Sequence, residues 1–178
     1  MHAYLHSLQV AINLSVRNLH EGSLLDTLDE TVTRHRIDPH EVELEITESA
    51  VMGDIEYCVT LIERLRDRGY RVSIDDFGTG HSSLAYLKKL PVNALKIDQA
   101  FIRGLPQDAS GRKIVRTILD LARSLHLESV AEGVEDQKAL ALLREWGCNY
   151  AQGYAVHKPS PPDQLVAWIE RSSVTPAA

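Results

Sequence analysis

Six short apolar runs recur along the chain, and longer segments of helical periodicity separate them. This alternation is typical of βα units, in which a helix follows each strand and the strands form a parallel sheet. The runs cover residues 9–15, 42–48, 71–75, 94–98, 129–132 and 150–152. Capping residues and stop signals place helices between them. We expect helices from Ser23 to about His35, from Asp54 to Gly69, from Ser82 or Ser83 to a point before Pro91, over 114–125, from Asp136 to Gly147, and around 165–169.

The pattern of side chains within the strands separates two parallel architectures, an open doubly wound sheet and a (β/α) barrel. Leu44 and Ile46 share one face of their strand while Glu45 lies on the other, and Lys96 likewise opposes Leu95. An open sheet covered by helices should be apolar on both faces, so the pattern favours a barrel. The run 129–132 fits less well, because Val130 and Glu132 share a face.

The length of the chain predicts one domain over residues 1–178, structured from roughly 8 to 172. A TIM-type barrel usually needs about 250 residues and eight strands. With 178 residues, the chain is short by a strand or two. We therefore expect an α/β fold of the modified TIM-type (β/α) barrel kind that is incomplete.

Polar side chains gather where the predicted strands end, which is where barrel enzymes place their sites. They are Asn13, Glu45, Glu48, Asp75, Asp76, Lys96, Glu132, Glu135 and Gln152. Converging carboxylates repel one another unless a cation joins them, so the set predicts Mg²⁺ or Mn²⁺. Four carboxylates and an amide suit two ions that share a bridging aspartate. Two such ions can activate a water molecule for attack on a phosphate group. Lys96 would then contact the attacking water or a phosphate oxygen.

Each of these residues also has an ordinary structural explanation. A single glutamate at a strand end is usually solvated, and the pair Asp75–Asp76 could form a helix cap or a turn. The stretch Gly78-Thr79-Gly80 lets the backbone approach a ligand closely, although a plain turn after a strand has the same composition. Repetition at the same end of successive strands favours the functional interpretation.

The formal net charge of −6 argues against binding of long nucleic acid, which needs a basic surface. No run approaches the ~18 apolar residues of a membrane span, and the first residues do not resemble a secretory signal. Two isolated cysteines, Cys58 and Cys148, form no disulfide framework. A cytoplasmic location is therefore expected.

The segment 75–84, DDFGTGHSSL, resembles the signature loop of the EAL domain family. Further blocks match the family pattern in order and spacing, and together they cover nearly the whole chain: Asn13-Leu14-Ser15, Glu45-Ile46-Thr47-Glu48-Ser49, Leu95-Lys96-Ile97-Asp98, Ala131-Glu132-Gly133-Val134-Glu135, Gln152-Gly153-Tyr154 and Lys158-Pro159.

The resemblance implies a modified (β/α) barrel that hydrolyses cyclic-di-GMP to linear pGpG with Mg²⁺ or Mn²⁺. It implies that Asn13, Glu45 and Asp75 ligate one metal ion and that Asp76 serves a second, with Asp75 bridging. By the same resemblance, Lys96 orients the water, Glu132 is a metal ligand or general base, and Glu48 braces the signature loop. Substrate contacts are implied for Gln152, Gly78, Thr79 and Gly80. Glu135 is implied to support the same end of the barrel.

The chain departs from the family at its beginning, because the Glu-Ala-Leu motif of the first strand and the arginine after it are absent. The barrel is then incomplete at the N-terminus. The chain is either a fragment of an ordinary phosphodiesterase or a truly truncated protein with an open barrel. As hypotheses from the family, the full domain forms a homodimer, and a sensory or GGDEF-type domain precedes it.

Two other functions compete with hydrolysis. An EAL-like domain without turnover would act as a cyclic-di-GMP receptor or a protein-interaction module. Alternatively, Lys96 at a strand end could form a Schiff base, as in class I aldolases. That chemistry has no need of several converging carboxylates.

Overall fold

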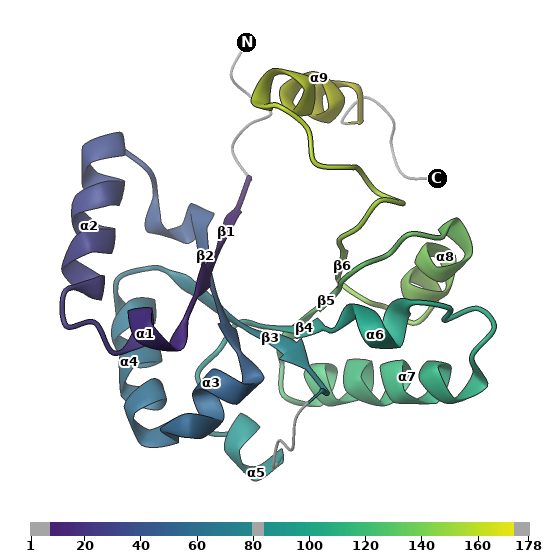
Figure 1. Cartoon of the computed structure of the whole chain (residues 1–178), viewed down its shortest axis with the longest axis horizontal. Coiled ribbons are helices and arrows are strands. Elements are labelled where there is room, and N and C mark those ends of the chain that lie inside the picture. Colours follow the sequence, from purple (N-terminus) through teal and green to yellow (C-terminus); the bar gives the residue numbers. More distant parts are fainter. Residues whose placement is uncertain (1–7, 80–83, 173–178) are drawn as a thin grey trace.

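The computed structural model describes residues 8–79 and 84–172. In this part of the chain six strands form one sheet, ordered as in the sequence, and every neighbouring pair is parallel. The strands are β1 (Val10–Leu14), β2 (Val42–Thr47), β3 (Arg71–Phe77), β4 (Ala94–Ile97), β5 (Glu128–Ala131) and β6 (Tyr150–Ala151). The sheet curves as part of a barrel, with helices on its outer side (Figure 1). All six predicted strands are confirmed.

Helices connect the strands as the alternation predicted. In the described residues they are α1 (Val16–Leu19), α2 (Leu24–His35), η1 (Pro39–Glu41), α3 (Glu48–Gly53), α4 (Ile55–Asp67), α5 (Leu84–Leu87), α6 (Gln99–Ile102), α7 (Ala109–Ser124), α8 (Gln137–Glu145) and α9 (Pro162–Ser172). The side chain of Asp54 caps α4 and that of Asp136 caps α8, as expected. Ser82 and Ser83, the predicted start of α5, lie outside the described residues. None of the described helices is long and apolar enough to cross a bilayer.

The short helix α3 was not predicted, and it ends the second strand one residue early. Thr47 Oγ1 accepts a hydrogen bond from the backbone N–H of Ala50 at 3.3 Å, so the helix begins at Glu48. A helix of six residues contains too few turns to show a periodic apolar stripe in the sequence. Its consequence is that Glu48 leaves the sheet and lies in the first turn of a helix.

The two faces of the sheet differ as the alternation predicted. The outer face, packed against helices, holds side chains that are at most 2% exposed: Leu44, Ile46, Val72, Ile74, Leu95 and Ile97. The inner face carries Glu45, Ser73, Asp75 and Lys96, which are also buried. Val130 of β5 lines a cavity on this inner face, together with Glu45 and Lys96. An apolar residue therefore stands between Glu128 and Glu132 in the sequence. The irregular pattern of the fifth run therefore reflects a mixed inner face.

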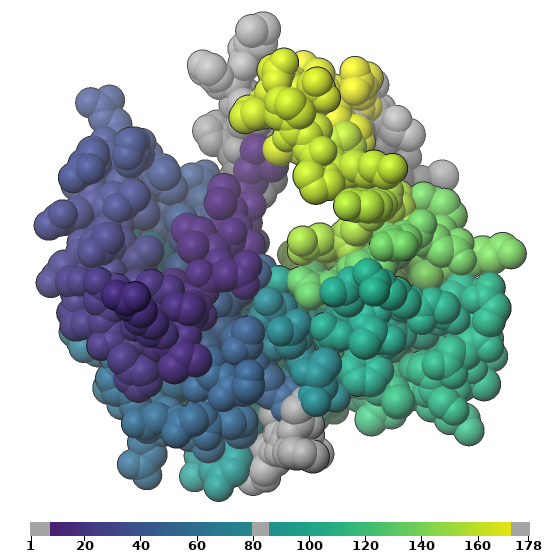
Figure 2. Space-filling model, viewed as in Figure 1, coloured from purple at the N-terminus to yellow at the C-terminus, as the bar shows by residue number. Residues whose placement is uncertain are grey.

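The first strand corrects one expectation. In a barrel the apolar face of each strand should meet helices, but the side chains of Val10 and Ile12 in β1 are 60% and 42% exposed. β1 pairs with β2 alone and forms one edge of the described sheet. The molecule is hollowed between β1 and the segment that leads to α9 (Figure 2).

Gly153 joins the turn after β6 to the loop after β5. Its φ is 151°, and a Cβ atom at this position would lie 2.3 Å from the backbone nitrogen of Val134. Three backbone hydrogen bonds hold the two loops together: Gln152 N to Ala131 O at 2.8 Å, Val134 N to Gln152 O at 3.0 Å, and Ala155 N to Val134 O at 2.8 Å. A side chain cannot enter this contact unless the two loops separate.

We expect the substitution Gly153→Ala to lower the free energy of unfolding by roughly 2–4 kcal/mol, because it combines a strained φ with a backbone clash. Urea denaturation followed by circular dichroism measures the change. Gly53→Ala is the matched control, since nothing lies within 4 Å of a Cβ at Gly53. Equal midpoints for the two variants would contradict the prediction.

Candidate active site at the carboxyl edge of the sheet

The residues expected to carry chemistry come from four neighbouring strands. Glu45 lies in β2, Asp75 and Asp76 in β3, and Lys96 in β4, while Glu132 directly follows β5. Because the strands are parallel and in sequential order, their carboxyl ends meet at one edge. The sequence therefore predicted correctly that these side chains converge.

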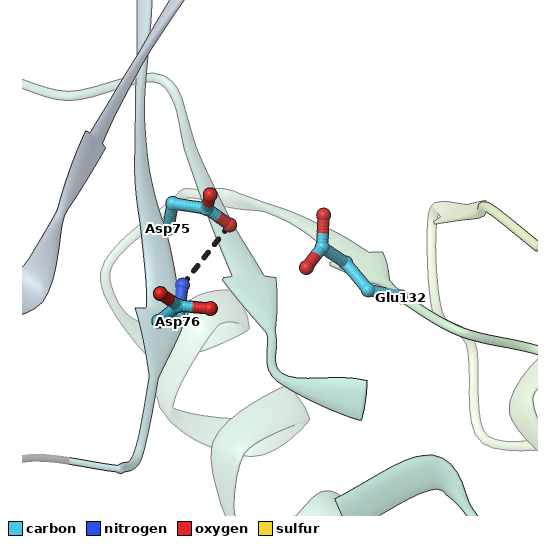
Figure 3. Close-up of side chains that lie close together, drawn as sticks. All are labelled: Asp75, Asp76 and Glu132. Carbon is cyan, nitrogen blue, oxygen red and sulfur yellow. Dashed lines mark hydrogen bonds between the residues drawn. The ribbon is translucent and has the colours of Figure 1, made fainter. Parts of the chain in front are cut away.

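Three carboxyl groups form the centre of the site (Figure 3). One oxygen atom each from Asp75, Asp76 and Glu132 lies within 4.8 Å of the others. The backbone N–H of Asp76 also donates to Asp75 Oδ1 at 3.0 Å, which fixes the orientation of that carboxylate. Such a set of hard oxygen donors fits a divalent cation of the Mg²⁺ or Mn²⁺ type.

Lys96 joins this centre to β2. Its Nζ lies 2.5 Å from Glu45 Oε1, 2.6 Å from Glu132 Oε1 and 3.3 Å from Asp75 Oδ1, and its side chain is 3% exposed. Burial lowers the pKa of Lys96, but hydrogen bonds to Glu132 and Glu45 outweigh it, so the pKa is raised. A Schiff-base lysine needs a depressed pKa. The ion pairs of Lys96 with three carboxyl groups act in the opposite direction and therefore argue against the aldolase alternative.

The carboxyl groups themselves are under electrostatic strain. Burial raises the pKa of Glu132 above its ordinary value, and the charges of Asp75 and Glu45 add to the effect, although Lys96 opposes it. The pKa of Asp76 is also raised, first by burial and then by the charge of Asp75. A cation at this edge would relieve both shifts, because it favours the ionised form of each carboxyl group.

The backbone at the end of β3 is built to present Asp76. Asp76 has a φ of 55°, a left-handed conformation that is uncommon for a residue with a side chain. Thr79 Oγ1 donates to the carbonyl oxygen of Asp76 at 2.9 Å, and Gly78 N donates to Glu48 Oε2 at 2.8 Å. The expectation that Glu48 braces the signature loop agrees with this contact. Gly80 lies outside the described residues.

Three further residues predicted for the site, Asn13, Gln152 and Glu135, lie on other parts of the inner face or in the loops that follow the strands. Asn13 pairs in register with Glu45, so the two side chains lie on one face of neighbouring strands. Gln152 lines a cavity together with Glu45 and Lys96. Glu135 is exposed in the loop after β5 and is not among the carboxyl groups within 4.8 Å of one another in the described residues.

Asp98 is a residue to which the sequence analysis gave no role. It follows β4 at the same edge of the sheet, caps α6 through the backbone N–H of Ala100 at 2.7 Å, and helps to raise the pKa of Asp76. Its position one residue beyond the strand, two after Lys96, was the available signal.

The sheet is curved, it is built from parallel βα units, and its carboxyl edge carries a lysine and several carboxyl groups. These features place the chain in the class of (β/α)-barrel proteins with an acidic site of the cation-binding type. Residues 1–159 match the model of the EAL domain. The chain belongs to the EAL domain family, which confirms both the resemblance and the barrel fold.

Two curated relatives come from Pseudomonas aeruginosa. The chain is 45% identical to "Cyclic di-GMP phosphodiesterase NbdA" over 154 residues, covering 86% of this chain and 20% of the relative. It is 42% identical to "Bifunctional diguanylate cyclase/cyclic di-GMP phosphodiesterase MucR" over 160 residues, covering 90% of this chain and 23% of the relative. The chain thus spans about a fifth of the length of these relatives.

Solved structures give the same family. The MucR phosphodiesterase in complex with cyclic-di-GMP superposes with a TM-score of 0.84 at 42% identity, over 88% of this chain and 64% of that one. The EAL domain of DcpA from Mycobacterium smegmatis gives 0.86 at 37% identity, over 92% and 73% of the two chains. The six-stranded sheet therefore corresponds to a large part of the EAL barrel.

Proposed function

We propose that this chain hydrolyses cyclic-di-GMP to linear pGpG and uses Mg²⁺ or Mn²⁺ to do so. The observation that carries the proposal is the convergence of Asp75, Asp76 and Glu132 within 4.8 Å beside the buried Lys96. Membership of the EAL family and the names of its relatives supply the substrate.

The charge of the site supports a metal-dependent reaction. Glu45, Asp75 and Glu132 contact the ammonium group of Lys96 and Asp76 lies beside them, so these five side chains have a formal charge of −3 when every group is ionised. Cyclic-di-GMP carries two negative phosphodiester groups, which such a site would repel. Divalent cations reverse the sign of the interaction, so that the same carboxylates can hold the substrate through the ions.

The donor set suggests how two ions would be held. Asn13, Glu45 and Asp75 would ligate one ion, Asp76 the other, and Asp75 would be shared, with Glu132 completing the set. Bound there, the ions would lower the pKa of a water molecule and screen the developing charge on the phosphate.

The other side chains would direct the reaction. Lys96, held protonated by its carboxylate partners, would orient the water and donate hydrogen bonds to it or to a phosphate oxygen. Glu132 has a raised pKa and would accept the proton of the water. Glu48 would keep the loop of Gly78 and Thr79 in place against the substrate.

Substrate contacts and bond changes complete the proposed reaction. Gln152 and the loop residues, Gly80 included, would contact the dinucleotide, and Glu135 would support this end of the barrel. The water oxygen forms a bond to phosphorus, the bond from phosphorus to the ribose 3′ oxygen breaks, and that oxygen takes up a proton. One ring opening consumes one water and gives pGpG.

Incubation of the chain with cyclic-di-GMP and Mn²⁺, followed by chromatography, tests this function. We expect pGpG to form with Mn²⁺ and no product when EDTA removes the ion. Binding of the dinucleotide without product would overturn the hydrolase proposal in favour of a receptor. Binding of the dinucleotide by an EAL domain is seen in the solved structure of FimX from Pseudomonas aeruginosa. That domain is bound to cyclic-di-GMP and is 26% identical to this chain.

A further inference from the structure

A second set of charged side chains joins the strands at the end opposite to the site. Arg71, the first residue of β3, has its Nε 3.6 Å from Glu43 Oε2 and its Nη2 in contact with Glu128 Oε2. The hydroxyl of Tyr150 donates to Glu128 Oε1 at 3.4 Å. We call the ion pairs of Arg71 with Glu43 and Glu128 the floor tie.

The floor tie spans the same two strands as Lys96. Glu43 and Glu45 lie two residues apart on the inner face of β2, while Glu128 begins β5 and Glu132 directly follows it. Glu43, Glu45, Lys96 and Glu128 line one cavity of about 240 Å³. Because β3 and β4 separate β2 from β5, no backbone ladder joins these two strands directly. Side chains therefore provide the direct links between them.

Two features make the floor tie more than a surface ion pair. Ala94 of β4 is in register with Glu128, and its small side chain lines the same cavity as Glu43 and Glu128. The side chains of Arg71 and Glu43 are only 22% and 12% exposed. In contrast, Arg123 and Asp120 on α7 form a pair whose members are 61% and 72% exposed, where solvent screens the charges.

We propose that Arg71 is a positioning residue for the metal-binding carboxylates, acting through Glu43 and Glu128. This inference rests on the proposed function, because it concerns how that site holds its ions. An ion bound by Glu45 or Glu132 would compete with Lys96 for that carboxylate and weaken the link that Lys96 makes between β2 and β5. The floor tie then keeps β2 and β5 at the spacing that both carboxylates require.

Mn²⁺ titration followed by electron paramagnetic resonance, well below the melting temperature, tests the inference. We expect Arg71→Met to weaken Mn²⁺ binding roughly three- to tenfold, as coupled substitutions away from a site do. Glu128→Gln should have a similar effect, and the double variant should add little because each single substitution already removes the Arg71–Glu128 pair. Arg71→Lys should restore part of the affinity. Arg123→Met, which removes the exposed pair on α7, should leave it unchanged.

The outcomes separate this inference from the proposed function. If the unaltered chain fails to bind Mn²⁺, both are overturned. If it binds Mn²⁺ and folded Arg71→Met binds it equally well, the floor tie has a structural role alone and only this inference is overturned. Should Arg71→Met fail to fold, Glu128→Gln and Ala94→Leu, which puts a larger side chain into the cavity beside Glu43 and Glu128, decide the question by the same measurement.

Discussion

The substitution Asp75→Asn is expected to lower the rate of cyclic-di-GMP hydrolysis on the order of 10³-fold, because stabilisation of charge by a bound metal amounts to several kcal/mol. Asp75, like Glu132, belongs both to the carboxylate cluster and to the contacts of Lys96. It lies in the cluster with Asp76 and Glu132, and its Oδ1 is 3.3 Å from the ammonium group of Lys96. Asparagine keeps the shape of the side chain and removes the charge.

The same substitution should leave the protein folded. The amide oxygen of asparagine can still accept the hydrogen bond that Asp76 N–H donates at 3.0 Å, and one source of repulsion within the cluster is lost. Product formation, Mn²⁺ affinity and the melting temperature should be measured together. Asp67→Asn, at the exposed end of α4, makes the same chemical change away from the site. Full activity in Asp75→Asn would remove this residue from the proposed metal site.

The fold was predictable because each strand carries its own pattern. In β2, in β3 as far as Asp75, and in β4, buried apolar residues alternate with polar or small ones, and this alternation distinguished the barrel from an open sheet. The ends of the elements were less predictable, because short capping contacts set them. Thr47 begins α3 and shortens β2, and no periodic pattern in the sequence announces a contact of that kind.

The site was predictable to the extent that chemistry follows strand ends. Glu45, Asp75, Lys96 and Glu132 each stand at or beside the end of a strand, and the parallel order brings them together. The sequence could not show that Lys96 contacts three of the carboxylates at once, because that arrangement depends on the curvature of the sheet. Arg71 escaped notice for the same reason, since its partner Glu128 lies 57 residues away along the chain.

The second large effect is expected for Lys96→Met, which should lower the free energy of unfolding at pH 7 by about 3–5 kcal/mol. Methionine has a similar length and no charge. It leaves Glu45, Asp75 and Glu132 close together without their shared cation, and Glu45 and Asp75 are buried. Lys113→Met, on the exposed side of α7, is the control. A loss for Lys96→Met no larger than that of the control would show that the carboxylates do not depend on Lys96.

The loss of unfolding free energy in Lys96→Met, called the deficit below, has a pH dependence that identifies its cause. Burial already raises the pKa of Glu132 in the presence of Lys96, and removal of the ammonium group should raise it further. A carboxyl group with a raised pKa in the folded state binds more protons there than in the unfolded chain, so stability falls as pH rises through that pKa. The deficit of Lys96→Met should therefore be full at neutral pH and should narrow as pH falls toward the ordinary carboxyl pKa of about 4. Urea denaturation at several pH values measures it. A deficit that stays constant over this range would point to lost packing around the lysine side chain as the cause.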